Sequence, residues 1–362
     1  MHINIDETNK TFQLTLNLND QYKTKNEPWI RESISKHSFS SRMIIIGIFL
    51  VLFSAHDLFS FSEAQQLQFG FYSETCPSAE SIVGDVVKQA VTKDPRNAAV
   101  LLRLHFHDCF VEGCDGSILI KHEVNDDERF APGNAGVGGF DVIDNAKSEL
   151  ERLCPGVVSC ADIVALAARN AVVAAKGPFY EVPTGRRDGL TSDKSNAANL
   201  PDVEDSINIL KSKFREKGLS DKDLVLLSAG AHTIGTTACF FIMSRLDAQD
   251  STISPEFFQV LRSKCPKGGD VNVRIPLDWE SQFVFDEQIF RNIRDGKGVI
   301  KSDSVLYQDN DMKNIIESYL ASNESSEANF AADFAEAMVK MGAIGVKTGV
   351  KGEVRRICNA TN

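Results

Sequence analysis

Apolar residues recur at helical spacing through most of the chain. After Pro77, the apolar positions between 82 and 91 fall three and four residues apart, and the pattern continues over 98–110 after a break at Asp94-Pro95. Such spacing predicts amphipathic helices, and strand-like alternation is scarce. The expected fold is therefore mainly α. Further helices are expected over 139–153, 159–176, 206–217, 221–232, 255–264, 311–322 and 329–341.

Segments rich in Gly, Asn, Pro and Asp separate these helices, notably 131–139, 183–202 and 266–280. Clusters of these residues predict long loops. A division near Pro201 would give a first lobe over about 66–200 and a second over about 201–345, with a cleft between them. Clefts between lobes are common cofactor sites.

The first part of the chain is expected to lie outside the fold. An uncharged apolar run at 44–53 begins just after Met43 and ends in small and polar residues. This layout predicts a secretory signal peptide over 43–65, since a membrane span needs about 20 apolar residues. Because a signal peptide normally starts its own reading frame, we expect translation to begin at Met43, after the polar extension 1–42. The alternative is a signal anchor with a cytosolic tail.

Charge and cysteine content narrow the classes of function. The chain has 39 Lys and Arg against 50 Asp and Glu, a formal net charge of -11, so it lacks the basic field that favours nucleic acid or anionic membranes. All 8 cysteines lie between Cys76 and Cys358. An even number suits four disulfides in an oxidising compartment, although the count alone leaves the pairing open.

The string Arg-Leu-His-Phe-His-Asp-Cys-Phe at 103–110 carries the first candidate chemistry. On a helix, Arg103 and His107 point the same way, next to Phe106, while His105 falls almost opposite. A guanidinium beside an imidazole can stabilise an oxyanion and move a proton at one centre. One alternative is a surface arginine with structural histidines. Another is a zinc site of His105, His107 and Asp108, which the i, i+2 spacing disfavours because helical zinc pairs are i, i+4.

Oxygen donors gather in the loop that follows. They are the side chains of Asp108, Asp115 and Ser117 and the carbonyls of Val111 and Gly113. Oxygen-rich coordination of this kind suits calcium. The alternative is an acidic, solvated turn tied by a disulfide between the two cysteines of the loop.

The string from 103 to 117 resembles the distal haem signature of the plant secretory (class III) peroxidases. The resemblance continues through Val-Ser-Cys-Ala-Asp at 158–162, Gly-Arg-Arg-Asp at 185–188 and Ala-His-Thr-Ile-Gly at 231–235, and it covers essentially all of 66–362. It implies a haem peroxidase fold with one haem b in the cleft, and a C-terminal segment that returns to the first, distal lobe. It also implies a secreted enzyme that reduces hydrogen peroxide to water and oxidises phenolic donors by single electrons. Asn323 and Asn359 begin Asn-x-Ser/Thr sequons, which predict a glycan on at least one of them if the chain is secreted. A monomer is the default expectation.

The resemblance assigns roles to five residues around the haem. Arg103 and His107 would act on the peroxide, Asn134 would orient His107, His232 would bind the iron, and Asp303 would hold the other nitrogen of His232. A carboxylate behind a ligating imidazole fixes its tautomer and raises its basicity.

The resemblance further implies two calcium ions, four disulfides and a donor site. The first calcium would take the five donors of the loop after His107, and small donors would meet the haem edge near Pro201. A buried structural ion-pair group is expected from Asp162, Arg186, Arg187 and Asp188, and His122 is expected at the surface. The second calcium would take Thr233, Asp278, Ser281, Val284 and Asp286. The disulfides would be Cys76–Cys154, Cys109–Cys114, Cys160–Cys358 and Cys239–Cys265.

Ser-Ala-Gly-Ala-His at 228–232 departs from the family pattern by one extra residue. On a continuous helix an insertion rotates everything upstream by about 100° and shifts it by about 1.5 Å. We expect 224–228 to be helical, an irregular turn at Ala229 or Gly230, and His232 facing the cleft opposite His107.

A second departure concerns the haem propionates. The segment 134–140 is one residue shorter than the family pattern and lacks its usual Ser-x-Arg, whose serine helps to hold a propionate in relatives. Ala238 stands where a polar side chain often does the same. Arg96 is the remaining candidate.

Two rival functions follow if parts of this interpretation fail. If the departures misplace Arg103, His107 or the propionate contacts, the protein is a haem-binding wall protein with weak or no activity. If the whole set of residues is coincidental, it is a structural disulfide-rich protein.

Overall fold

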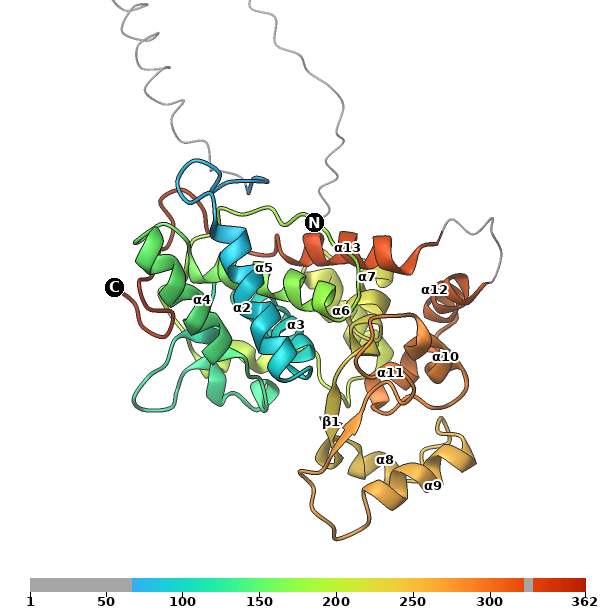
Figure 1. Cartoon of the computed structure of the whole chain (residues 1–362). Coiled ribbons are helices and arrows are strands. Elements are labelled where there is room, and N and C mark those ends of the chain that lie inside the picture. The colour runs from blue at the N-terminus through green and yellow to red at the C-terminus, as the bar shows by residue number, and fades with distance from the viewer. Residues whose placement is uncertain (1–66, 322–327) are drawn as a thin grey trace, which may run out of the picture. The chain divides into compact units, whose positions relative to one another are not determined.

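The computed structural model describes residues 67–321 and 328–362. The predicted extension and signal peptide, and the possible glycan acceptor Asn323, lie outside them. Helices dominate, with one two-stranded sheet among the described residues (Figure 1). No helix in the described ranges is long and apolar enough to cross a membrane.

Four helices build the first half of the described chain. They are α2 (Ala79–Lys93), α3 (Asn97–Phe110), α4 (Phe140–Leu153) and α5 (Cys160–Ala174). Helix α5 is apolar on nearly every side, as expected for a helix enclosed by others, and α2, α3 and α4 pack against it. Four short 3₁₀ helices accompany this half: η1 (Ser117–Leu119), η2 (Glu128–Phe130), η3 (Pro132–Asn134) and η4 (Lys194–Asn199).

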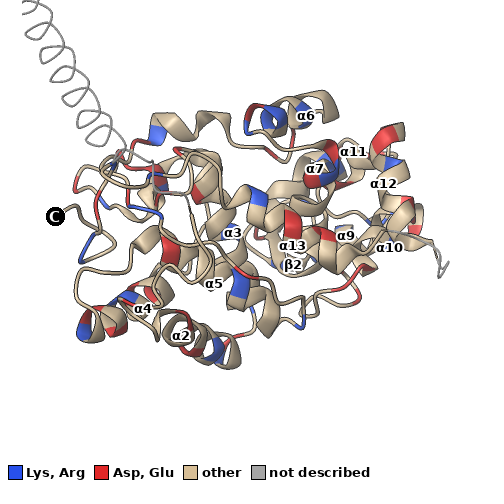
Figure 2. Cartoon of the chain, turned by 90° about the horizontal axis from the view of Figure 1, so that it is seen from above, with Lys and Arg blue, Asp and Glu red and all other residues tan. Residues whose placement is uncertain are grey.

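Helix α2 shows how the pattern produces an element. Ala79, Val83 and Val87 recur every four residues and are buried, while the charged residues of the helix lie at other positions, namely Glu80, Asp85, Lys88 and Lys93 (Figure 2). Such a stripe of apolar residues favours a helix packed on one face. The helix ends where Asp94 adopts an extended backbone before Pro95, because the residue before a proline disfavours helical angles.

The second half is built from shorter helices. Helix α7 begins with a reciprocal cap, in which Ser220 and Asp223 each bond the other's backbone N–H, an arrangement that satisfies two donors at the helix start. The helices are α6 (Ile207–Glu216), α7 (Asp221–Leu227), α8 (Met243–Asp247), α9 (Pro255–Lys264), α10 (Gln288–Arg294), α11 (Lys301–Leu306), α12 (Asn310–Leu320) and α13 (Phe330–Met341). The 3₁₀ helices are η5 (Gly230–Thr233) and η6 (Cys239–Ile242).

A short two-stranded sheet begins just after η5 in the chain. Strand β1 (Thr236–Ala238) pairs antiparallel with β2 (Arg274–Pro276), and Ala238 lies opposite Arg274. The sequence pattern predicted a loop throughout 266–280, and this was wrong for β2. Three residues are too few to show an alternation.

The predicted helix over 221–232 was also wrong in its second half. Helix α7 ends at Leu227, and Ser228 leaves helical angles with φ -93° and ψ -92°. Ala229 is again helical, and η5 follows it. The irregular residue is therefore Ser228, one position before the predicted turn. The extra residue is absorbed by ending one helix and starting a tighter one, and His232 N–H still donates to the carbonyls of Ser228 and Ala229 at 3.3 and 3.0 Å.

The other predicted helices are confirmed to within a few residues at their ends, and 255–264 agrees with α9 at both ends. Helices α8, α10 and α11 were missed, because five to seven residues do not establish a period. All four expected disulfides are present.

The C-terminal segment lies against the first half of the chain. Arg355 is fully buried and donates to the carbonyls of Cys358 and Gly116 at 2.7 and 2.6 Å. The disulfide Cys160–Cys358 joins residues 198 positions apart. The last turns of the chain are therefore part of the scaffold around α3 and α5.

Candidate active site

His107 lies near the end of α3 with its ring held by two successive hydrogen bonds. Its Nδ1 lies 2.7 Å from Oδ1 of Asn134, whose Nδ2 donates to the backbone carbonyl of Glu128 at 2.7 Å. Because that carbonyl occupies the amide nitrogen, the amide oxygen of Asn134 accepts the hydrogen of His107 Nδ1. The Nε2 atom of His107 is left free to accept a proton.

The surroundings of His107 keep its ring neutral. The residue is 6% exposed. Burial and the charge of Arg103 lower its pKa from 6.5 to about 3, against a smaller opposing effect of Asn134. Burial disfavours the charged imidazolium. His107 is therefore an unprotonated base at neutral pH.

Arg103 lies one turn before His107 on the same face of α3. Its Nη2 donates to the backbone carbonyl of Ala135 at 3.2 Å, and no carboxylate of the described residues forms an ion pair with it. Burial, and then the charge of Arg274, lower the pKa of Arg103 to about 10. It remains a cation at neutral pH with unused donors beside the base. Phe106 packs edge-on against the His107 ring at 5.6 Å, so the face predicted for this helix is confirmed.

His232 occupies the second candidate centre, on η5. Its Nδ1 lies 2.9 and 3.2 Å from the two carboxylate oxygens of Asp303, which is fully buried at the start of α11. The side chain of His232 is 30% exposed. Since Nδ1 is held by Asp303, Nε2 is the atom that can bind a metal. The predicted pairing of His232 with Asp303 is present.

The two centres fit a haem. Helix α3 lies against η5, so the base and the candidate iron ligand come from neighbouring elements. An imidazole with one nitrogen held by a buried carboxylate is a common ligand of haem iron in proteins. On the other side, Arg103 offers a charge without a partner among the described residues. His232 would hold the iron, and Asp303 would set the basicity of that ligand.

The first predicted calcium site is a cluster of buried oxygens that lack hydrogen-bond partners. Asp108 Oδ1 and Ser117 Oγ make no well-formed hydrogen bond to the described residues. Burial and the nearby Asp115 raise the pKa of Asp108 well above its usual value. Uncompensated buried carboxylates of this kind call for a cation, so the residues fit calcium. One oxygen of Asp115 is instead occupied by an ion pair with Lys347.

Glu128 belongs to the same cluster and was not predicted. It is fully buried, neither of its carboxylate oxygens has a well-formed hydrogen bond, and burial raises its pKa to about 9. The same residue holds Asn134 through its backbone. Glu128 therefore connects the first oxygen cluster to His107 through Asn134, and no local pattern around it in the sequence indicates this.

The second predicted calcium site lies directly after His232. Thr233 Oγ1 is 3.4 Å from both the carbonyl of Val284 and Oδ1 of Asp286. Ser281 Oγ lies 3.0 Å from the same oxygen of Asp286, and Asp278 Oδ2 is buried without a partner among the described residues. Thr233 thus lies against a second segment, 278–286, in which Asp278 carries a buried carboxylate oxygen without a partner among the described residues. This donor set also fits calcium.

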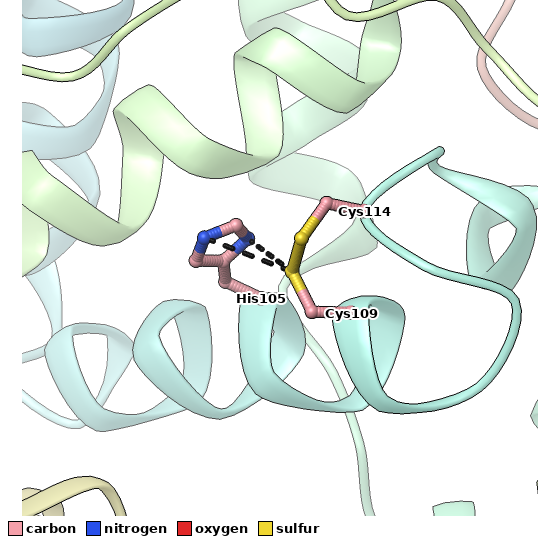
Figure 3. Close-up of side chains that lie close together, drawn as sticks. All are labelled: His105, Cys109 and Cys114. Carbon is pink, nitrogen blue, oxygen red and sulfur yellow. Dashed lines mark hydrogen bonds between the residues drawn. A yellow bond between two sulfur atoms is a disulfide. The ribbon is translucent and has the colours of Figure 1, made fainter. Parts of the chain in front are cut away.

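His105 takes no part in the site. Its ring lies beside the disulfide Cys109–Cys114, with Nδ1 3.6 Å from Cys109 Sγ (Figure 3). These three side chains are close enough together to hold a metal, but both sulfurs are bonded to each other and are not thiolates. The zinc alternative of His105 with His107 finds no support, since the two rings lie on opposite sides of α3.

The expected structural ion-pair group needs one correction. Arg186 pairs with Asp162 at 2.7 Å, both buried. Asp188 instead faces the buried Arg355, whose backbone N–H donates to it at 2.8 Å. Arg187 is outside the group, because its guanidinium donates to the carbonyl of Gly352. Arg355 was missed because its partner is 167 positions away.

Three further candidates are placed as follows. Arg96, proposed above for a propionate, makes a two-pronged ion pair with Asp94 at 2.7 to 3.0 Å. His122 lies at the surface beside Asp126. Pro201 is half-buried, two residues after the end of η4.

A cavity of about 900 Å³ opens between α2 and the C-terminal end of α5. Ile234 and Gly235, which follow His232 and Thr233, form part of its wall, but Arg103, His107 and His232 do not line it. It adjoins the site without containing its reactive groups.

Comparison with known proteins decides the family. A model of the peroxidase family matches residues 83–322. The chain belongs to the peroxidase family. Peroxidase 13 of Arabidopsis thaliana is 79% identical over 320 residues, which are 88% of this chain and 100% of that protein. Peroxidase 43 of the same plant is 56% identical over 82% of this chain and 92% of its own length, and peroxidase N1 of Nicotiana tabacum is 46% identical over 90% and 99%.

These relatives confirm the resemblance to plant peroxidases. The chain is a peroxidase, an oxidoreductase that uses a haem iron and hydrogen peroxide, and the mainly α haem peroxidase fold is confirmed.

Proposed function

We propose that this peroxidase reduces hydrogen peroxide with His107 as the proton carrier and Arg103 as the cation that stabilises developing negative charge. The observation that carries the assignment is the chain from Glu128 through Asn134 to His107, which leaves Nε2 of a neutral imidazole as the acceptor. The bound haem supplies the electrons that cleave the oxygen–oxygen bond.

His107 and Arg103 would act on different parts of the peroxide reaction. His107 Nε2 accepts the proton of the oxygen that approaches the iron and returns it to the distant oxygen, which then leaves as water. Arg103 faces the same space and stabilises the charge on the departing oxygen. On the opposite side, His232 would bind the iron, while Asp303 accepts the hydrogen of its Nδ1 and keeps that imidazole basic.

We further assign calcium to the two oxygen clusters, one ion in each. Support comes from buried carboxylate oxygens of Asp108 and Asp278 that have no partner among the described residues. Both clusters adjoin the centres they would stabilise, because Asp108 follows His107 and Thr233 follows His232 in the chain.

Phenolic compounds are the proposed donors, oxidised one electron at a time near Pro201. The proposed mature protein is a secreted monomer of residues 66–362, with two lobes divided near Pro201 and a C-terminal segment on the first. Four disulfides among the described residues support an oxidising compartment.

Replacing His107 tests the central assignment. In His107→Leu we expect haem to bind as in the wild type and the first peroxide-dependent change in haem absorbance to slow by roughly two orders of magnitude or more. His122→Leu, at the surface, is the matched control and should react normally. An unchanged rate in His107→Leu would remove this residue from the mechanism.

A further inference from the structure

Two arginines near the site have no acidic partner among the described residues. Arg103 donates only to the carbonyl of Ala135. Arg274, on β2, donates through Nε to Thr236 Oγ1 at 3.0 Å and through Nη2 to the Thr236 carbonyl at 2.5 Å. Neither contact neutralises a charge, and Nη1 of Arg274 has no hydrogen-bond partner among the described residues.

The two guanidiniums are close enough to repel one another. The charge of Arg274 adds to burial in lowering the pKa of Arg103, and the charge of Arg96 adds to burial in lowering the pKa of Arg274. Arg96 is already neutralised by Asp94. Like charges that act on one another without acidic partners create a field that favours an anion.

The strand pairing places Arg274 beside Ala238, the position where this chain lacks a polar side chain. Ala238 and Arg274 lie directly opposite each other in the β1–β2 pair, and opposite residues in antiparallel strands project from the same face with their Cβ atoms about 5 Å apart. Thr236, two residues from Ala238, shares that face, which explains its contacts with Arg274. The small side chain of Ala238 leaves the face open to the longer arginine.

We propose that Arg274 binds a carboxylate of the haem, in the place left by Ala238 and by the missing serine of the 134–140 loop. The inference rests on haem binding at His232, four residues before β1 begins. A planar guanidinium can pair with a carboxylate through two parallel N–H···O bonds. The contacts with Thr236 fix the orientation of the Arg274 guanidinium. Its free Nη1 and the second hydrogen of Nη2 are available to a haem carboxylate. Arg96 is the weaker candidate, because binding would compete with its ion pair to Asp94.

The test compares haem with its dimethyl ester, whose two carboxylates are uncharged and cannot accept a charge-assisted pair. Both are titrated into the apoprotein and followed by the Soret absorbance, for the wild type, Arg274→Ala, Arg274→Lys and the control Arg294→Ala. Arg294 lies on the surface beside Asp295. Circular dichroism checks that each variant is folded.

We expect Arg274→Ala to weaken haem affinity by about tenfold, the usual scale for losing a charged hydrogen bond, and to leave the affinity for the dimethyl ester unchanged. Arg274→Lys should recover part of the loss for haem, and Arg294→Ala should match the wild type. Equal losses for haem and ester would mean that Arg274 only supports β1, and no loss for haem would also overturn the proposal. A wild type that binds neither compound would instead refute the assignment of His232 as the haem ligand, and the inference with it.

Discussion

At the scale of single residues, the proposed base of this peroxidase, His107, is held by a side chain that is not charged. An aspartate facing His107 would raise the pKa of the imidazole, whereas the amide of Asn134 fixes its tautomer and leaves the pKa low. The backbone of Glu128 determines which end of that amide faces the ring. The side chain of Asn134 and the backbone carbonyl of Glu128 together leave Nε2 of His107 free.

The low pKa of His107 predicts an unusually flat pH profile. Because the folded pKa is about 3, the rate of the peroxide step should stay constant from pH 7 to about pH 4 and fall only nearer pH 3. Stopped-flow measurement of the absorbance change at each pH checks this. A decline centred near pH 6.5 would show that the imidazole is not held neutral.

The lowered pKa of His107 also makes the stability of the folded protein depend on pH. The unfolded chain binds a proton on this histidine below pH 6.5, while the folded chain does not until about pH 3, so stability from this group is lost as the pH falls through that window. His105, with its pKa also lowered to about 3 by burial and by Arg186, adds to the effect.

Asp303 offers a prediction for the opposite side of the site. Asp303→Asn removes the charge behind His232, so the imidazole becomes a weaker donor and the reduction potential of the iron should rise. A spectroscopic redox titration of the haem-loaded variant measures this directly. An unchanged potential would mean that Asp303 does not act on the axial ligand.

At the scale of elements, the notable feature is the break between α7 and η5. Sequence spacing alone predicted one helix through His232, because Leu224 to Leu227 and Ala229 all suit a helix. After the break at Ser228, the chain brings Gly230 against two aromatic rings: a Cβ on Gly230 would lie 3.1 Å from the Phe330 ring and 3.6 Å from Phe290. Gly230 is therefore needed for close contact with these rings and not for unusual backbone angles.

Deletion of Ala229 tests whether the break between α7 and η5 serves only to accommodate the extra residue before His232. We expect the deletion to join α7 to the next turn and to keep haem affinity or improve it, as measured by Soret titration. Ser212→Ala, on the surface of α6, is the control for effects of mutagenesis and purification. Loss of haem binding would show that the irregular turn itself positions His232.

Local signals explain which parts of the site could be predicted from sequence. Arg103 and His107 are four residues apart on one helix, so their common face follows from helical geometry. Asn134, His232 and Asp303 were reached only through the family resemblance, since nothing local marks them. Glu128, Arg274 and Arg355 were missed because each acquires its role from a partner brought close by the tertiary fold.

At the scale of the whole molecule, several buried acids have carboxylate oxygens without a hydrogen-bond partner among the described residues. Folding removes Asp108, Glu128 and Asp278 from water, and burial raises the pKa of each. A bound divalent ion would offset this cost in both halves of the chain.

Calcium removal should therefore destabilise the protein in a pH-dependent way. Without calcium, Glu128 keeps its proton in the folded state up to about pH 9 but loses it near pH 4.5 when unfolded, so stability from this group declines as the pH rises through that range. The drop in melting temperature on adding EGTA should be larger at pH 7 than at pH 5. Adding magnesium and EGTA together is the control. Equal melting temperatures with and without EGTA at both pH values would contradict the calcium assignment.

The buried Arg355 and the disulfide Cys160–Cys358 have a consequence for biosynthesis. The guanidinium of Arg355 supports the carbonyl of Gly116 beside the first oxygen cluster, so that loop reaches its final form only after Arg355, 239 positions later, has been made. A nascent chain that still lacks Arg355 and Cys358 would present α3 and α5 without this support. Maturation of the distal side of the site thus has to wait until this segment has been synthesised, and the disulfide that secures it joins residues 198 positions apart.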